Sequence, residues 1–303
     1  MTTDASDIDT DWPDVPPPHR VAPRRPLDEL PLLPIEQPSA FGRDPKRFFD
    51  LLWLISTQQY RLQYRTSLLG YVWTVLRPLM LFGVLYFVFT QVLRFGQGIE
   101  DYALMLLLGI MLFQFFVDAT GTALGALVRN EPVVRKMHFP RVVIPLSVVV
   151  STGMTALVNL AVTLGFVLAF GEGAHWTWLL VPFAFLALAL LTTGVALLLS
   201  ALYVRVRDVG QIWAVLSRAL FYGSPIIFPL ERVPDRFQEI IALNPLAPIL
   251  NQARIWVLQP DVPSTVAVVG WPTFIASIAL GVAICAAGLW LFVRQAPRVA
   301  ELL

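Results

Sequence analysis

Four long stretches of this chain contain no charged residue, and they constrain its fold more than any other feature. They are residues 102–117, 142–170, 176–204 and 271–293. A helix needs about 20 apolar residues to cross the hydrocarbon core of a bilayer. The whole chain is 56% apolar and only 14% charged, whereas soluble domains carry about 25% charged residues. We therefore predict an all-α polytopic membrane protein.

Two further stretches complete the predicted set of spans. Residues 71–93 qualify if Arg77 sits at the cytoplasmic interface, where a long cationic side chain can reach the headgroups. Residues 212–230 are irregular, because Gly223, Pro225 and Pro229 interrupt them and Arg218 adds a charge. The sequence thus predicts six transmembrane helices, of which the fifth is irregular.

The distribution of Lys and Arg predicts the orientation of these spans, because cytoplasmic loops carry an excess of cations. Cations precede the first span, lie between the second and third and between the fourth and fifth, and follow the sixth. In that order they are Lys46, Arg47, Arg61 and Arg65; Arg129, Arg135, Lys136 and Arg141; Arg205 and Arg207; Arg294 and Arg298. Both termini are therefore expected in the cytoplasm, as an even number of spans requires.

The N-terminal part differs from the rest. Residues 1–43 are acidic, then rich in proline and basic, and this composition predicts a disordered cytoplasmic tail. Residues 44–67 are predicted to form an amphipathic interfacial helix, with Phe48, Leu51, Leu52 and Ile55 on one stripe. Ordinary packing of that stripe against the bundle is the alternative. Residues 68–303 are assigned to the six-span domain.

Several kinds of chemistry are not supported by the sequence. The chain contains no Gly-x-x-x-x-Gly-Lys-Ser/Thr loop for nucleotide phosphates. Its single cysteine, Cys285, and its three scattered histidines have no metal-ligand spacing. No span carries the paired carboxylates of an ion-coupled transporter, and the lone Asp118 is interpreted as a capping or packing residue. We therefore expect no catalytic residue, no metal site and no cofactor in this chain.

The loop between the second and third spans, residues 129–141, is short, cationic and amphipathic. Asn130 and Pro132 suit the cap and the first turn of a short helix. Phe139 precedes Pro140, and a proline disfavours helical geometry at the residue before it. The loop is predicted to contact another polypeptide on the cytoplasmic side; the alternative is that its cations only fix the topology.

Two other segments have unusual patterns. Arg207 and Asp208 could form a local ion pair that caps the fifth helix. Beyond it, residues 237–243 and 246–258 are amphipathic, too short to span a bilayer, and separated by Asn244 and Pro245. We predict re-entrant elements at the outer face, with a plain extracellular loop as the alternative.

Five motifs occur in order along the chain: Tyr64-Arg-Thr-Ser-Leu-Leu-Gly-Tyr-Val-Trp73 with Arg77-Pro-Leu79, Val134-Arg-Lys-Met-His-Phe-Pro-Arg-Val-Val-Ile-Pro-Leu146, Arg207-Asp-Val-Gly-Gln211, Phe221-Tyr-Gly-Ser-Pro-Ile-Ile-Phe-Pro229 and Leu243-Asn-Pro-Leu246. In combination they resemble the type-2 ATP-binding-cassette export permeases, in the branch that exports polysaccharides, O-antigens and teichoic acids. Residues before Phe41 lie outside the resemblance. Arg218 departs from it, because an uncharged residue is expected there.

The resemblance implies roles for three groups of residues. A cytoplasmic coupling helix would contact an ATPase through Arg129, Glu131, Val134, Arg135, Lys136, His138, Phe139, Pro140 and Arg141. The openings of the first and fifth spans would depend on Arg65, Gly70, Trp73, Arg77, Pro78, Arg207, Asp208 and Gln211. Outer gate helices would involve Ser224, Pro225, Asn244, Pro245 and Arg254.

The sequence and the resemblance together favour the permease subunit of an exporter in a bacterial cytoplasmic membrane. It is expected to form a homodimer with two copies of a separate ATPase, which binds ATP and Mg, and to have no nucleic-acid partner. The expected cargo is a lipid-linked polysaccharide, such as an O-antigen, a galactan or a teichoic-acid-like polymer. A drug or lipid exporter is the alternative. A membrane-embedded transferase is less consistent with the absence of acidic pairs or histidines on a suitable cytoplasmic loop.

Overall fold

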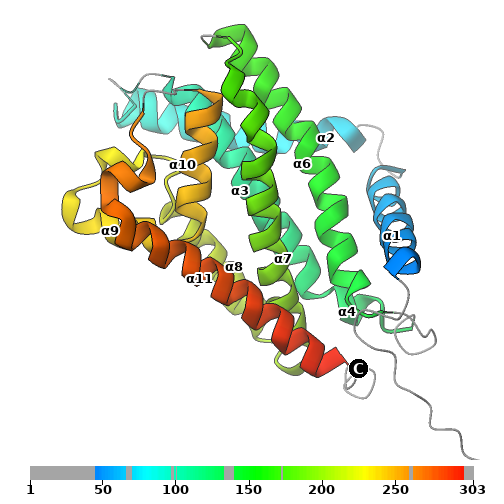
Figure 1. Cartoon of the computed structure of the whole chain (residues 1–303). Coiled ribbons are helices and arrows are strands. Elements are labelled where there is room, and N and C mark those ends of the chain that lie inside the picture. Colours follow the sequence, from blue (N-terminus) through cyan, green and yellow to red (C-terminus); the bar gives the residue numbers. More distant parts are fainter. Residues whose placement is uncertain are drawn as a thin grey trace, which may run out of the picture. The chain divides into compact units, whose positions relative to one another are not determined.

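The computed structural model describes residues 45–65, 70–96, 99, 101–132, 140–171, 173–258 and 262–296. All of them belong to one structural unit, residues 38–303. The described secondary structure consists of helices, with no strand among the described residues (Figure 1). This confirms the all-α prediction, whereas the predicted tail, residues 1–43, lies outside the described residues.

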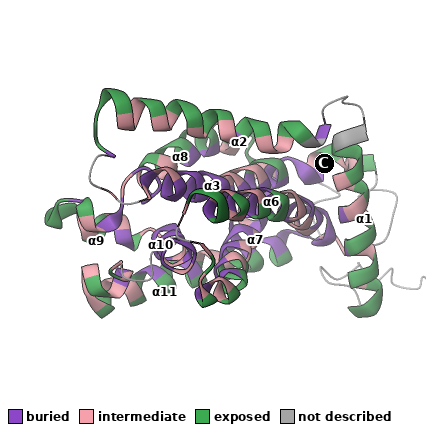
Figure 2. Ribbon diagram, turned by 90° about the horizontal axis from the view of Figure 1, so that it is seen from above, coloured by how far each residue is buried: buried purple, intermediate pink, exposed green. Residues whose placement is uncertain are grey.

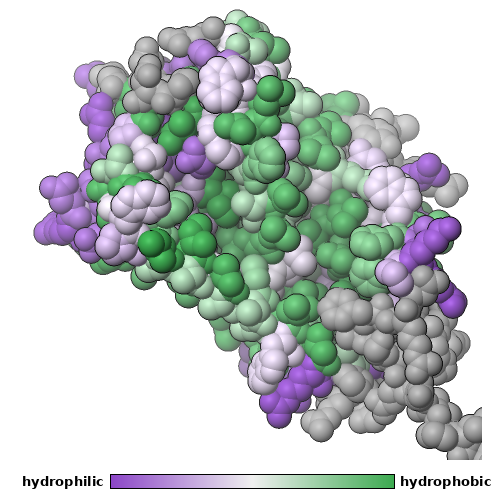
Figure 3. Space-filling model, viewed as in Figure 1, coloured by the Kyte–Doolittle hydropathy of each residue, from purple (hydrophilic) through white to green (hydrophobic). Residues whose placement is uncertain are grey.

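Five helical segments of the described chain are long and apolar enough to cross a membrane. The first is α2 (Gly70–Tyr86), continued by the π-helix η2 (Phe87–Val92); the others are α3 (Tyr102–Leu124), α6 (Val143–Phe170), η3 (Trp176–Leu180) with α7 (Val181–Arg205), and α11 (Thr265–Gln295). They correspond to five of the six predicted spans. Figure 3 shows hydrophobic side chains across the middle of one face, with hydrophilic ones near α9 and the C-terminal end of α11.

Helix α11 contains a kink at the point where the predicted span begins. Gly270 has φ 78°, a left-handed conformation that glycine adopts without steric cost. Trp271 and Pro272 follow it directly, so the apolar run of 271–293 forms the straight part beyond the kink.

Helix α3 is the centre of the bundle. It is buried along most of its length, whereas α2 has few buried residues and is otherwise exposed or intermediate (Figure 2). Aromatic rings join α3 to its neighbours: Phe115 stacks on Phe185 of α7 with 5.2 Å between ring centroids, and Phe113 meets Phe221 of α8 at 5.3 Å. Aromatic pairs at these separations stabilise packing beyond the area that they bury.

Helices α7 and α11 approach each other closely enough to exclude a side chain. A Cβ atom on Gly288 would lie 2.2 Å from the carbonyl oxygen of Gly194, and one on Gly194 would lie 2.6 Å from Cα of Cys285. Small residues at such positions allow membrane helices to pack backbone against backbone. This contact sets the position of α11 along α7.

The predicted fifth span, residues 212–230, is not a single long helix. Helix α8 (Val209–Tyr222) has 14 residues and ends immediately before Gly223. At 1.5 Å per residue it is about 21 Å long, less than the ~30 Å of a hydrocarbon core. The described chain therefore has five helices of spanning length, and the count of six is not confirmed.

After α8 the chain forms short elements at one end of the bundle: η4 (Leu230–Arg232), α9 (Asp235–Leu243) and α10 (Leu246–Val257). The irregular stretch before η4 is buried, and Ile226 is 0% exposed. It packs against α3, where a Cβ on Gly109 would lie 3.1 Å from a methyl group of Ile226. Irregular backbone at membrane depth is tolerated where protein surrounds it, as here.

Helix α1 (Pro45–Arg65) packs against α6 through the stripe that the sequence predicts. Leu52 and Ser56 on this side are buried, whereas Phe49, Trp53 and Leu54 on the opposite side are more than 60% exposed. The predicted stripe therefore packs on the bundle, while the interfacial position of α1 stays a prediction. The exposed aromatic side is the one available to lipid headgroups.

Candidate coupling, span-opening and outer-gate sites

The loop predicted to contact a partner begins at the end of α3. The short helix α4 (Ala126–Arg129) follows α3, and the guanidinium of Arg129 donates a hydrogen bond to the backbone carbonyl of Thr122. Asn130 Nδ2 donates to the carbonyl of Ala126 at 2.8 Å. The bond from Arg129 reaches a carbonyl in the last turn of α3, where a helix leaves carbonyl groups without intrahelical partners. Arg129 therefore holds α4 against the end of α3, while Asn130 bonds within its own turn at the end of α4.

Most of the predicted coupling residues lie beyond this point. Glu131 and Pro132 are helical, as expected of the start of a short helix. Val134, Arg135, Lys136, His138 and Phe139 lie outside the described residues, so the coupling helix itself stays a prediction.

The structure describes the chain again from Pro140. The Pro140 carbonyl accepts a hydrogen bond from Val143 N at 3.0 Å at the start of α6. Arg141 Nη1 donates to the carbonyl of Ala296, just after α11. The sequence did not indicate this link, because the two residues are 155 positions apart. Arg141 thus joins the start of α6 to the end of α11.

Four of the predicted span-opening residues, all of them on α2, line one of two adjoining polar cavities. Arg65 ends α1 and Gly70 begins α2. Trp73, Arg77 and Pro78 line a cavity of 230 Å³ together with Gly70. A second cavity of 420 Å³ shares Arg77 and also contains Arg129. The structure therefore brings the opening of α2 and the start of the predicted coupling loop to the same place.

Asp118 lines both of these cavities. It accepts a hydrogen bond from Gln114 Nε2 at 2.7 Å, one turn earlier on α3. No second carboxylate lines either cavity among the described residues. Asp118 is thus hydrogen-bonded to its own helix and borders both cavities.

The opening of the fifth predicted span differs from expectation. Asp208 occupies the N-cap position of α8, but its side chain makes no capping hydrogen bond. Arg207 lies 5.0 Å from the ring centroid of Tyr203 in a cation–π contact. The predicted Arg207–Asp208 ion pair is therefore wrong for the described structure, because the tyrosine ring offers Arg207 another partner. Gln211 is exposed on the first turn of α8.

Tyr203 also joins α8 to the end of α3. A Cβ on Gly210 would lie 3.3 Å from its ring, and one on Gly125 would lie 3.8 Å from it. The ring is thus packed between the first turn of α8 and the junction of α3 with α4. Sequence reasoning did not identify Tyr203, although an aromatic residue four positions before an arginine is a recognisable cation–π pattern.

The predicted outer-gate residues are held together by hydrogen bonds. Asn244 Nδ2 donates to Ser224 Oγ at 2.8 Å, and Asn244 Oδ1 accepts from Leu246 N at 3.1 Å. Pro225 is buried beside Ser224, and Pro245 occupies the N-cap position of α10. One side chain thus connects the stretch after α8 to the junction of α9 and α10.

Arg254 of α10 is 6% exposed and forms an ion pair with Glu231 of η4, with 3.0 Å between Nη1 and Oε1. Sequence reasoning did not identify Glu231, because a loop carboxylate gives no sign of a partner 23 residues away. Buried arginines need such a partner to offset the loss of hydration. The pair therefore fixes η4 to α10.

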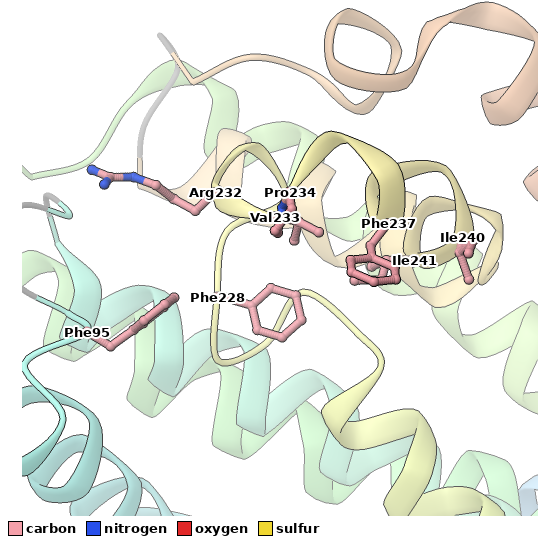
Figure 4. Close-up of a pocket in the computed structure, with 8 residues that line it drawn as sticks. All are labelled: Phe95, Phe228, Arg232, Val233, Pro234, Phe237, Ile240 and Ile241. Carbon is pink, nitrogen blue, oxygen red and sulfur yellow. The ribbon is translucent and has the colours of Figure 1, made fainter.

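An apolar pocket of 360 Å³ lies next to these elements (Figure 4). Phe228 and Phe95 line it on one side, and Phe237 and Ile241 of α9 line it on the other. Ile240 of the same helix is 68% exposed. The outer elements thus combine a polar interior with an apolar face.

Residues 50–258 match the family model described as ABC-2 type transporter, and the match covers more than half of the chain. The chain belongs to the ABC-2 type transporter family. The matched region includes the cavities, residues 129–141 and the elements from α8 to α10, and it excludes α11.

Similar proteins include two permeases and one transport protein of known systems. The chain is 31% identical to the O-antigen export system permease protein RfbA of Klebsiella pneumoniae over 208 residues, which cover 68% of this chain and 79% of that protein. It is 27% identical to RfbA of Myxococcus xanthus over 211 residues, 69% of this chain and 80% of the relative. The polysialic acid transport protein KpsM of Escherichia coli is 20% identical over 202 residues, 65% and 77% of the two chains.

Membership of the ABC-2 family fixes the class of protein. The chain is a multi-pass membrane permease, a transport component and not an enzyme. Such a permease works with an ABC ATPase partner. No group of three or more His, Cys, Asp or Glu that could hold a metal ion occurs among the residues with described positions.

Proposed function

We propose that this ABC-2 permease exports a lipid-linked polysaccharide across the cytoplasmic membrane of a bacterium. The observation that carries the proposal is the similarity over two thirds of the chain to permeases whose names specify O-antigen export. The polysialic acid transport protein, a more distant relative, also acts on a glycan by name. A drug or lipid exporter would not be expected to share this set of relatives.

The exposure of α2 and α8 supports a homodimer. Helix α2 is the least buried of the five long helices, and α8 buries only Trp213 and Ser217. Arg218 in the C-terminal half of α8 is exposed. A cation in the centre of a membrane helix costs about 2.5–3.5 kcal/mol if it faces lipid. We therefore place α2 and α8 of two copies around a water-filled path, with Arg218 facing that path.

The sixth crossing is formed, in this proposal, by α8 and the elements that follow it. Helix α8 and the buried stretch up to η4 cover the depth that α8 alone does not reach. Helices α9 and α10 then re-enter the outer face as gate helices. Six crossings and the distribution of Lys and Arg give a cytoplasmic position for both termini.

Coupling to the ATPase would act through residues 129–141. Two ATPase copies bind ATP and Mg, close, and push this loop. The hydrogen bond of Arg129 to Thr122 would make α3 move with the loop. The ring of Tyr203, packed between the α3–α4 junction and α8, would make α8 move as well. Arg141 passes the movement to the end of α11 through the Ala296 carbonyl. Movement of α8 would then change the outer elements, because Ser224 is bonded to Asn244.

Depletion of this chain in its native bacterium tests the cargo. The proposal predicts that lipid-linked glycan accumulates in the cytoplasmic leaflet while glycan at the cell surface falls. Altered drug sensitivity with normal surface glycan would instead support a drug exporter and overturn the cargo assignment.

Labelling with a membrane-impermeant thiol reagent tests the path. In a Cys285→Ser background, Arg218→Cys should be labelled in intact membranes. Leu190→Cys, at a 60% exposed position in the middle of α7, is the matched control and should stay unlabelled. Equal labelling of the two variants would contradict a water-filled path along α8.

A further inference from the structure

The two adjoining polar cavities form a pocket between α1, α2, α3 and α6 that the proposed transport path does not use. The smaller cavity, 230 Å³, includes Trp73, Gln114 and Asn159, and the larger, 420 Å³, includes Arg129 and Ser151. Polar and ionisable residues within membrane-spanning helices are expensive and usually mark a ligand or ion site. We call the two cavities together the headgroup pocket.

The larger cavity has the chemistry of an anion site. Arg77 and Arg129 both line it, and Asp118 is the only carboxylate among its described lining residues. The described lining residues therefore carry one net positive charge. An arginine has five N–H donors, so Arg129 keeps donors for a ligand beyond the one that it gives to Thr122. Two guanidinium groups on one cavity suit a phosphate.

The smaller cavity has the chemistry of a hydroxyl site. Asn159 is 6% exposed, and its buried Oδ1 has no hydrogen-bond partner. An acceptor buried without a partner costs about 1–3 kcal/mol, so a donor on a ligand would relieve it. Trp73 lines the same cavity and is 48% exposed, which gives an aromatic surface beside the polar groups. A polyol or sugar offers both hydroxyl donors and apolar C–H faces.

We propose that the headgroup pocket binds the phosphorylated polyol headgroup of a membrane lipid. The phosphate lies between Arg77 and Arg129, and a hydroxyl group donates to Asn159. The assignment of the ligand's chemistry does not depend on the proposed orientation of the chain. Only the side of the membrane from which the lipid enters depends on it. Two sources share this chemistry: a phospholipid such as phosphatidylglycerol, and a glycan joined to a lipid through phosphate.

Lipid binding to the purified full chain, followed by native mass spectrometry, tests the proposal. We expect phosphatidylglycerol to bind more tightly than phosphatidylcholine. Arg77→Gln should weaken both phosphatidylglycerol and phosphatidic acid about tenfold or more, because each loses a charge-assisted hydrogen bond. Asn159→Leu should weaken phosphatidylglycerol about fivefold and leave phosphatidic acid unchanged, because phosphatidic acid has no headgroup hydroxyl.

Matched variants separate this site from general charge effects and from unfolding. Arg47→Gln removes an exposed cation from α1 that does not line the pocket, and it should leave binding unchanged. Arg77→Lys keeps the charge and should retain part of the affinity, and the thermal midpoint of each variant reports its folding. Equal binding of phosphatidylglycerol and phosphatidylcholine, or an equal loss in Arg47→Gln and Arg77→Gln, would overturn the proposal.

Competition identifies the source of the headgroup. Displacement of phosphatidylglycerol by a synthetic polyprenyl-phosphoryl sugar assigns the pocket to the cargo, and failure to displace it assigns the pocket to bulk phospholipid; both outcomes support the site. If no glycan is exported but phosphatidylglycerol still binds through Arg77 and Asn159, the proposed function fails while the site stands.

Discussion

The contact between α7 and α11 gives the most direct test of the fold. Replacing Gly288 by alanine would place a Cβ atom 2.2 Å from the carbonyl oxygen of Gly194 and 3.2 Å from the backbone nitrogen of Leu198. Both atoms belong to the backbone of α7, so no side-chain rotation can relieve the contact. The two helices must therefore move apart.

The size of the effect follows from these distances. A Cβ atom almost never approaches another heavy atom more closely than 3.0 Å, so the helices must separate locally by about 1 Å. Forcing one extra methyl group into a close-packed contact costs about 1–3 kcal/mol. Replacing a glycine inside a helix by alanine also stabilises that helix by up to about 1 kcal/mol. Gly165→Ala on α6 is the matched control, because nothing lies within 4 Å of its added Cβ.

Thermal unfolding of the two variants in detergent, followed by tryptophan fluorescence, measures the difference. Since the gain in helix propensity is common to both, Gly288→Ala should be about 1–3 kcal/mol less stable than Gly165→Ala. A difference of this size lowers Tm by roughly 2–4 °C per kcal/mol in a protein of about this length. Equal midpoints would refute the backbone contact between α7 and α11.

Three further predictions concern the other described contacts. Arg254→Met should lower the free energy of unfolding by about 1–3 kcal/mol, because it leaves Glu231 without its partner at 3.0 Å. The double variant with Arg254→Met and Glu231→Gln should lose less stability than the two single variants lose together, as measured by their thermal midpoints. Asn244→Ala removes the bonds to Ser224 and Leu246 and should speed proteolysis of the outer elements. Arg141→Gln should raise hydrogen exchange at the end of α11, while unchanged exchange would exclude its link to Ala296.

The spans could be predicted because the bilayer imposes length and apolarity on each helix separately. The fifth span was harder to predict, because Gly223, Pro225 and Pro229 indicate where α8 ends but not which path the chain takes after it. Its path depends on Ile226 fitting against Gly109 of α3, a contact between residues far apart in sequence.

The residues of the headgroup pocket had a signal that sequence reasoning did not use. Gln114 and Asp118, Thr155 and Asn159, and Trp73 and Arg77 are each four residues apart. Such pairs occupy one face of a helix, so the polar faces of three apolar helices could have been predicted to meet.

Other contacts had no comparable signal. Arg141 bonds to a backbone carbonyl, which carries no sequence information, and the Arg254–Glu231 pair depends on the fold of the outer elements. The same holds for the stacking of Arg207 on Tyr203, since Asp208 was the nearer partner in sequence.

ATP-dependent export in proteoliposomes is the most direct test that this chain is the permease of a glycan exporter. The chain is reconstituted with its ATPase partner, and transfer of a lipid-linked glycan across the bilayer is measured with and without ATP and Mg. We expect transfer only when all components are present, and its loss when Arg135, Lys136 and Phe139 are replaced together by alanine. Transfer at the normal rate by this triple variant, or transfer without the ATPase, would contradict the account.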